Sequence, residues 1–146
     1  TEKVITFLPQ LTSETIPWST IHGDLHAGNA MLSDSNQIIV LDFDLCGRGP
    51  MAYDIASYIW ASEKIGVDKT LETNFLAGYE EIRRITPAEK EALPLLIVAK
   101  SIWWLALRAI LVKQLGSKEF SSHKINVFMS RLRRDAKSSP LLSDIQ

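Results

Sequence analysis

The sequence predicts an α+β protein that is mostly α-helical and carries one short β-hairpin. Two observations support this fold class. Apolar runs rich in Ile, Val and Leu flank a turn-forming "DSNQ" within residues 30–42, which is typical of a hairpin. From residue 51 onward, the apolar side chains recur at helical spacing. The chain has 146 residues and no obvious linker, so we expect residues 1–146 to form a single domain.

The segments around the hairpin are expected to be short. Residues 3–11 are compatible with a short helix. Pro17 directs the chain into the extended segment "TIHG", because the residue before a proline avoids helical angles. After the hairpin, the glycines and the proline of "CGRGP" are expected to break the pattern. Only the hairpin is therefore expected to form a sheet.

Helices are expected throughout the rest of the chain. Their predicted ranges are near residues 51–63, 68–84, 87 or 93 to 115, and 119–135. Pro87 and Pro94 are acceptable near helix starts, and Gly116 is a typical stop signal. The tail from Lys137 onward is expected to be loose.

The composition excludes several partners. Sixteen basic and 17 acidic side chains leave a net charge of −1, which provides no field to attract nucleic acid. The single Cys46 excludes an internal disulfide and suits a reducing compartment, so a cytoplasmic location is expected. Residues 93–112 approach the length of a membrane span. Because Lys100, Ser101 and Arg108 interrupt this run, a buried helix is expected and no membrane contact.

The stretch "IHGDLHAGN", residues 21–29, concentrates polar groups that suggest chemistry. One interpretation is zinc, because His22 and His26 would share a face of a helix. That interpretation requires a helix, whereas Gly23 and Gly28 bracket the motif and an extended segment precedes it. No glutamate stands beside the first histidine to activate a water molecule. Zinc is therefore the weaker interpretation.

The same stretch fits phosphoryl transfer better. His22, Asp24, Leu25 and Asn29 match the fixed positions of the kinase catalytic loop H-R-D-L-x-x-x-N, with Gly23 in place of the arginine. In such a loop, the aspartate accepts or orients the proton of the attacking hydroxyl. The asparagine supplies a neutral oxygen to a magnesium ion that bridges the phosphates.

A second acidic loop follows the predicted hairpin. Asp42 and Phe43 resemble the D-F-G element whose aspartate holds magnesium, with Asp44 in place of the glycine. A divalent cation would remove the repulsion between the two carboxylates. A calcium loop does not fit "DFDLCG", because Cys46 occupies its fifth position and Tyr53 its twelfth, where a bidentate glutamate is needed.

Together, "HGDLHAGN" and "LDFDLCGRGPMAYDIA", within about residues 20–60, resemble the aminoglycoside phosphotransferase and choline kinase family. This resemblance implies the C-terminal lobe of the protein-kinase-like fold, in which the hairpin carries the catalytic and metal loops. It implies transfer of phosphate from ATP, the co-substrate, to a hydroxyl of a small molecule such as an aminoglycoside, choline or homoserine. It also implies Mg2+ as the cofactor.

The resemblance assigns roles to three residues. Asp24 would be the catalytic base or the group that orients the hydroxyl. Asn29 and Asp42 would be the magnesium ligands and would thereby bind the nucleotide. Taken singly, each of these residues could instead form a turn, cap the loop or end a strand. Their shared order and spacing favour the kinase-like site.

Four further residues are candidates for supporting roles. His22 is expected to brace the loop through hydrogen bonds, and Asp54 is expected to be a buried anchor or an acid at a helix start. His26 and Asp44 are expected to face substrate or metal.

The aromatic and basic clusters of the last two helices are assigned structural roles. Trp103 and Trp104 are adjacent, so they point in different directions, and core packing is expected for both. "RLRR", residues 131–134, is expected to be a solvated face.

The sequence contains no glycine-rich phosphate loop and no strand lysine of the kind that a kinase places over its nucleotide. The chain is therefore expected to be a C-terminal catalytic lobe from which the N-terminal nucleotide-binding lobe is absent, and to be inactive alone. Its expected partners are a nucleotide, a hydroxyl substrate, and either the missing lobe or a second copy that covers exposed apolar surface. The alternative is a non-catalytic binding or interaction module derived from such a kinase.

Overall fold

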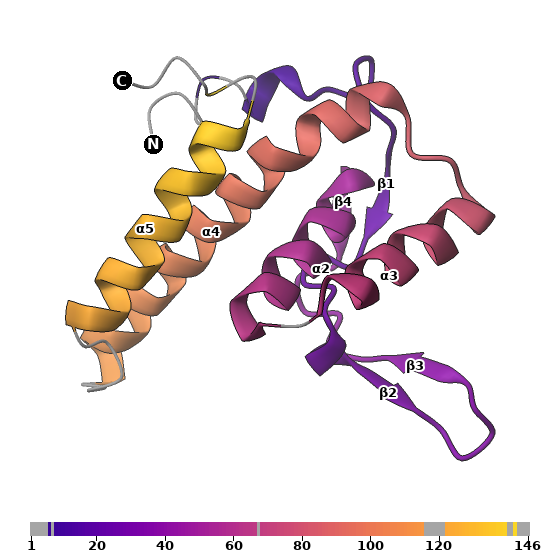
Figure 1. Ribbon diagram of the computed structural model, residues 1–146, viewed down its shortest axis with the longest axis horizontal. Coiled ribbons are helices and arrows are strands. Elements are labelled where there is room, and N and C mark those ends of the chain that lie inside the picture. The colour runs from indigo at the N-terminus through magenta and orange to yellow at the C-terminus, as the bar shows by residue number, and fades with distance from the viewer. Residues whose placement is uncertain (1–5, 7, 67, 116–121, 140–141, 143–146) are drawn as a thin grey trace.

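The computed structural model describes residues 6, 8–66, 68–115, 122–139 and 142. It places a β-hairpin and a short two-stranded ribbon beside four long helices (Figure 1). The first element with described bounds is a 3-10 turn, η1, Leu8–Gln10. Most of the chain is helical, as the sequence predicts.

The predicted hairpin is confirmed. β2, Ala30–Leu32, pairs antiparallel with β3, Ile38–Val40, so that Ala30 lies opposite Val40. Asn36 takes a left-handed φ of 64° in the connecting turn, a conformation that asparagine tolerates. Figure 1 shows the hairpin projecting away from the helices, and its apolar side chains Leu32 and Ile38 are exposed.

The expectation that only the hairpin forms a sheet is wrong. β4, Gly47–Pro50, lies within the segment "CGRGP" and pairs antiparallel with β1, Trp18–Ile21. Gly49 lies opposite Ser19, and its missing side chain leaves room for Ile21. Pro50 is tolerated because it is the last residue of a strand that has only one partner.

Each predicted helix is present, with shifted ends. α2 is Ala52–Ile65, α3 is Lys69–Ile82, α4 is Pro87–Leu115 and α5 is Ser122–Ser138. α4 starts at the earlier of its two predicted positions, because Thr86 and Glu89 form reciprocal capping hydrogen bonds around Pro87. The predicted stop at Gly116 lies outside the described residues.

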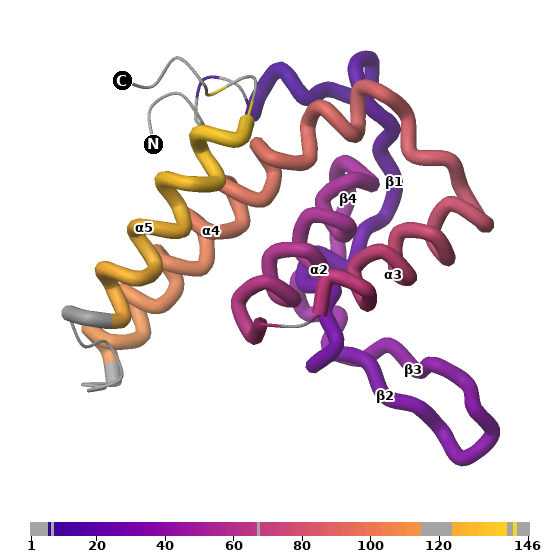
Figure 2. Tube along the Cα trace, in the orientation of Figure 1, coloured from indigo at the N-terminus to yellow at the C-terminus, as the bar shows by residue number. Residues whose placement is uncertain are grey.

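The core lies between α2 and α4, while α5 runs antiparallel beside α4 (Figures 1 and 2). Ala52 and Ala56 of α2 are small enough to let the helices approach, and they contact Leu96 of α4. Leu142 is fully buried against Leu95, so the expectation of a loose tail fails at this residue.

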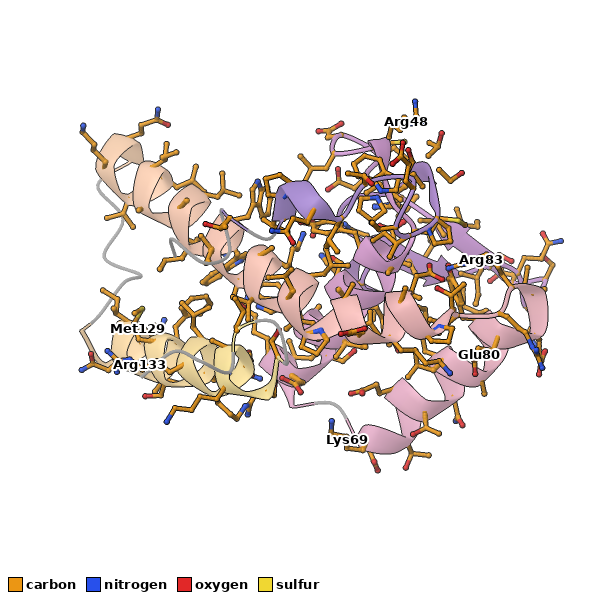
Figure 3. All side chains as sticks on the ribbon, turned by 90° about the horizontal axis from the view of Figure 1, so that it is seen from above. Arg48, Lys69, Glu80, Arg83, Met129 and Arg133 are labelled. Carbon is orange, nitrogen blue, oxygen red and sulfur yellow. The ribbon has the colours of Figure 1, made fainter. Side chains whose placement is uncertain are left out.

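The arginine-rich segment of α5 lies mainly at the surface, as expected. Arg133 is exposed on the outer side of α5 (Figure 3). Arg134 is also exposed and forms an ion pair with Glu63 of α2 at 2.9 Å. Leu132 of the same segment packs on the buried cluster around Leu95.

Only the first half of α4 is a buried helix of the kind that the sequence predicts. Leu95, Leu96, Val98 and Lys100 are buried, whereas Leu107 is 38% exposed. Within the described part of the chain, this helix, over Pro87–Gln114, is the one stretch long and apolar enough to cross a membrane, and 28% of its most apolar window is buried. Core helices of soluble proteins satisfy the same criterion.

Candidate active site

The loop between β1 and β2 is held by the first turn of α2. Asp54 in that turn accepts hydrogen bonds from the backbone N–H groups of His22 at 2.8 Å and Gly23 at 2.9 Å. Gly23 has a φ of +81°, and a Cβ atom there would collide with the backbone carbonyl of Leu45. The loop therefore needs glycine at this position both for its conformation and for its close approach to the second acidic loop.

His22 connects the two predicted loops. Its Nε2 lies 2.8 Å from the carbonyl oxygen of Leu41, and its Nδ1 accepts the N–H of Asp24 at 3.2 Å. Because a carbonyl oxygen can only accept, Nε2 carries the proton and the imidazole is neutral in this arrangement. Leu41 immediately precedes Asp42, so His22 ties the start of the loop after β1 to the start of the second acidic loop.

The geometry does not support the zinc interpretation. The segment from His22 to His26 is not helical, and only Ala27–Asn29 forms a 3-10 turn, η2. His26 uses Nδ1 to accept the N–H of Gly28 at 3.0 Å, while both ring nitrogens of His22 are engaged elsewhere. Across the described ranges, no three His, Cys, Asp or Glu side chains gather as a metal site.

Asp24 forms an ion pair with a buried lysine. The Nζ of Lys100, a residue of α4 that is 0% exposed, lies 2.6 Å from Oδ1 of Asp24 and 3.2 Å from the carbonyl oxygen of Gly23. The second carboxylate oxygen, Oδ2, lies 3.6 Å from Nε2 of His26. One oxygen of Asp24 is thus committed to the protein interior, and the other lies toward His26.

Aromatic rings surround the buried ammonium group. Lys100 Nζ lies 4.5 Å from the ring centre of Trp103 and 5.7 Å from that of Tyr53, so both rings shield it from water. Burial, with further contributions from Asp24 and Asp54, raises the pKa of Tyr53 to about 12. The phenol beside the site is therefore even harder to ionise than that of a free tyrosine.

Asn29 lies between the two acidic loops. Its side-chain Nδ2 donates to the backbone carbonyl oxygen of Asp24 at 3.0 Å, and its backbone carbonyl oxygen accepts the N–H of Leu41 at 2.8 Å. The side-chain oxygen of Asn29 takes no part in either of these hydrogen bonds. An amide oxygen in this position is a suitable ligand for a hard cation.

Asp42 and Asp44 are exposed at the start of the second loop. Asp42 has a φ of +61°, a left-handed conformation that a non-glycine residue adopts rarely and that clusters at functional sites. Among the residues that the structure describes, the Asp42 carboxylate has no hydrogen bond and no ion pair. Its oxygens are consequently available to a cation.

A cavity of about 510 Å3 opens beside Asp24. Its lining includes Asp24 and His26 from the loop, Lys64 from α2, and Trp103 and Arg108 from α4. Asn29 and Asp42 do not line it. The structure thus places Asp24 at the edge of the cavity, next to Asn29, with His22 and Asp54 behind the loop; the catalytic and metal-binding roles remain predictions.

The expectation of core packing for both adjacent tryptophans is only half right. Trp104 is half-buried and packs against Trp60 and Phe128, with ring centres 5.7 and 5.3 Å away, while one part of it also lines the cavity. Trp103 is 36% exposed and forms part of the cavity wall, where its ring covers the ammonium group of Lys100. Trp103 lies at the cavity wall and not in the core because its ring shields this buried charge from water.

The sequence motifs do not reveal Lys100, Lys64 and Arg108 as residues that lie beside the loop or line the cavity. Lys100 had a signal, because a lone lysine within a long apolar helix is either exposed or held by a specific partner. Burial, Arg108 and Arg131 together lower the pKa of Lys64, while Asp24 acts in the opposite direction.

Comparisons with known proteins identify the family to which this fold belongs. The sequence profile of the phosphotransferase enzyme family matches residues 1–93, and the chain belongs to this family. The resemblance and the fold class inferred from the sequence are therefore confirmed.

Two curated relatives and one solved structure illustrate the similarity. An uncharacterized protein of Deinococcus radiodurans is 36% identical over 107 residues, covering 70% of this chain and 31% of that protein. A homoserine kinase of Rhizobium meliloti is 34% identical over 95 residues, covering 63% and 29%. An amicoumacin kinase, solved in complex with AMP-PNP and Ca2+, aligns with a TM-score of 0.68 and 23% identity over 94% of this chain and 43% of that one. The chain spans about a third of the length of the curated relatives it matches.

Replacing Gly23 with alanine tests how the loop is held. Gly23→Ala should destabilise the protein by about 2 kcal/mol or more, because it adds the cost of a left-handed alanine to a collision with the Leu45 carbonyl. Gly78→Ala is the matched control, since nothing lies within 4 Å of a Cβ in that exposed part of α3. The control substitution should raise the free energy of unfolding by up to about 1 kcal/mol. Equal effects in denaturant unfolding would contradict the constraint at Gly23.

The ion pair between Asp24 and Lys100 should respond asymmetrically to substitution. Asp24→Ala leaves a fully buried ammonium without its carboxylate and should cost about 3–5 kcal/mol of unfolding free energy. Lys100→Met should cost less, because the Asp24 side chain is 26% exposed and water can solvate it. The double variant should regain most of the loss caused by Asp24→Ala. Additive losses in a double-mutant cycle would show that the two residues are not coupled.

Proposed function

We propose that this chain is the catalytic C-terminal lobe of an enzyme that transfers phosphate from ATP to a hydroxyl group of a small molecule. Membership of the phosphotransferase enzyme family supports the reaction class. Homoserine kinases among the relatives support a small alcohol as the acceptor. The observation that carries the proposal is the position of Asp24, fixed by Lys100 at the edge of a cavity and hydrogen-bonded to Asn29 on its other side.

Asp24 would act on the acceptor hydroxyl through one oxygen. Lys100 engages Oδ1, which leaves Oδ2 as the oxygen that can take or orient the hydroxyl proton. The ion pair also restricts rotation of the carboxylate, so the acceptor meets a fixed group. Fixed positioning matters here because phosphoryl transfer depends chiefly on alignment and charge stabilisation.

Asn29 and Asp42 would hold a magnesium ion, with Asp44 nearby. These oxygen ligands suit Mg2+, because the hydrogen bond of the Asn29 side chain uses its nitrogen and not its oxygen, and the Asp42 carboxylate is exposed. Mg2+ is usually held by one or two carboxylates together with substrate phosphates, so this small set suffices. When bound, the ion would neutralise charge on the phosphates of ATP.

A second, nucleotide-binding lobe would come from a part of the protein outside this chain. The relatives are about three times as long as the matched region. Large apolar side chains on and after the hairpin are exposed, including Met31, Ile38, Leu41 and Phe43. We propose that the second lobe packs over this surface and encloses the nucleotide, although self-association would cover it too.

Two substitutions in the complete protein separate the proposed roles. Asp24→Asn should lower kcat by about a hundredfold or more and leave ATP binding nearly unchanged, because its carboxylate addresses the acceptor. Asp42→Asn should weaken magnesium-dependent ATP binding, because it removes a negative ligand from the cation. Calorimetric titration of ATP with Mg2+, followed by steady-state kinetics, measures both effects. Equal losses of ATP affinity would contradict this division of roles.

The isolated chain should bind ATP and Mg2+ weakly and transfer phosphate far below an ordinary enzyme rate of about 10 per second. Each missing electrostatic clamp on the phosphates costs about a hundredfold or more if single-donor effects transfer. Comparing this chain with the complete protein in an ATP-consumption assay tests this expectation. Full activity of the chain alone would overturn the two-lobe proposal. An inactive complete protein that still binds ATP would favour the non-catalytic alternative.

A further inference from the structure

His26 lies on the cavity side of Asp24, and its ring is held in one orientation. The residue caps the 3-10 turn η2, where its Nδ1 accepts the backbone N–H of Gly28 at 3.0 Å and its carbonyl oxygen accepts that of Asn29 at 2.9 Å. A Cβ atom on Gly28 would lie only 2.9 Å from Cε1 of the ring. The glycine therefore lets the imidazole lie directly against the turn, which leaves the ring little freedom to rotate.

The hydrogen bond from Gly28 also fixes the tautomer of His26. A ring nitrogen that accepts an N–H carries no proton of its own, so the neutral imidazole has its proton on Nε2. While the capping bond persists, Nε2 is a donor and cannot take a proton from Asp24 or from a hydroxyl group. The side chain therefore offers the cavity a single N–H group.

This N–H group lies close to Asp24 without a hydrogen bond to it. Nε2 is 3.6 Å from Oδ2 of Asp24, which is beyond the range of an N–H···O hydrogen bond. Both side chains are partly exposed, and both line the cavity of about 510 Å3. Within the described ranges, Nε2 forms no hydrogen bond. A donor and an acceptor thus lie side by side at the same part of the cavity wall.

We propose that His26 is the second group that holds the acceptor: its Nε2–H donates to the oxygen of the acceptor hydroxyl, which donates its own proton to Oδ2 of Asp24. The proposal rests on the function proposed above, which assigns the hydroxyl to Asp24. An oxygen atom can lie about 2.8 Å from both atoms, because they are 3.6 Å apart. The angle at that oxygen is then about 80°. It reaches the tetrahedral value when the two groups part by about 1 Å, a small side-chain adjustment of the kind that accompanies ligand binding.

Two hydrogen bonds to the hydroxyl would set the direction of its attack. A hydroxyl group has one proton and two lone pairs on its oxygen. With the proton on Asp24 and one lone pair on His26, the other lone pair is free to face the terminal phosphorus of ATP. In the transfer, the hydroxyl proton passes to Oδ2, the oxygen bonds to phosphorus, and the electron pair of the broken P–O bond leaves with ADP.

The hydrogen bond from His26 makes the hydroxyl oxygen a slightly weaker nucleophile. This cost is small, because bonding to the nucleophile has made little progress in the loose transition state of most phosphoryl transfers. Alignment of the reacting atoms, in contrast, determines much of the rate. Orientation by His26 would therefore outweigh the loss of nucleophilicity.

Two other uses of His26 fit its position less well. A metal ion needs an unprotonated nitrogen, and Nε2 carries the proton in this tautomer. A contact with the phosphates of ATP would place them on the cavity side of Asp24. The proposed magnesium ligands, Asn29 and Asp42, lie outside the cavity lining. A phosphate contact would reveal itself as a loss of ATP affinity when His26 is replaced.

ATP hydrolysis by the complete protein tests the proposal without an identified acceptor, because water takes the place of the hydroxyl group. His26→Asn keeps an acceptor for the N–H of Gly28, since asparagine is a favoured cap, and its shorter side chain no longer brings a donor close to Oδ2. This variant should lower the kcat of hydrolysis about tenfold, which is the worth of one hydrogen bond, and leave the KM for ATP with Mg2+ unchanged.

His26→Gln is the matched variant, because a glutamine amide carries an N–H group about as far from the backbone as Nε2 of histidine. It should recover most of the rate that His26→Asn loses. Asp24→Asn should lower kcat as well, and adding His26→Asn to it should cost much less than a further tenfold, because the two side chains act on one oxygen. Thermal unfolding of each variant checks that it is folded.

Five results would overturn the proposal: unchanged kcat in His26→Asn, an equal loss in His26→Gln, a raised KM for ATP in His26→Asn, fully additive losses in the double variant, or a complete protein that binds ATP without hydrolysing it. Unchanged kcat in His26→Asn, combined with loss of activity in Asp24→Asn, would refute the role of His26 and leave the proposed function intact. A complete protein that neither binds nor hydrolyses ATP would instead refute the proposed function itself.

Discussion

The arrangement of the site depends on one buried charge. Lys100 has no exposed surface, and an ammonium group in such a place is tolerated only when a carboxylate and further acceptors face it. Asp24 and the carbonyl of Gly23 meet this requirement. The loop after β1 must therefore lie against α4, and α4 in turn packs on α2, whose Asp54 holds the same loop from behind. The contacts that make the burial of Lys100 tolerable are thus the same contacts that place the Asp24 carboxylate.

This anchoring separates two chemical environments around Asp24. On one side, Asn29 and the segment from Leu41 to Asp42 present oxygen atoms suited to a hard cation. On the other side, helices α2 and α4 enclose the cavity with aromatic and cationic side chains. The family match covers residues 1–93, which include the loops on the first side and the part of the cavity wall that comes from the first loop and α2; α4 beyond residue 93 supplies the rest of the wall.

Features set by local sequence were predictable, and features set by distant contacts were not. The hairpin and the helices follow from turn residues and apolar spacing, and the order of Asp24, Asn29 and Asp42 pointed to the family. The pairing of β1 with β4 was missed because "GRGP" has no strand propensity of its own and is stabilised by its partner. Lys100 was missed because its partner, Asp24, is remote in sequence. Trp103 was assigned to the core because a sequence cannot distinguish a ring that fills the interior from one that covers a buried charge.

A crystal structure of the complete protein with AMP-PNP and Mg2+ tests the proposed site most directly. We expect a metal ion held by the oxygens of Asn29 and Asp42, with Asp24 outside the coordination sphere and its Oδ1 still paired with Lys100. The Oδ2 atom of Asp24 should then face the cavity and lie close to the terminal phosphate. A metal ion held by His22 or His26, or phosphates lying on Lys64 and Arg108 inside the cavity, would contradict the account.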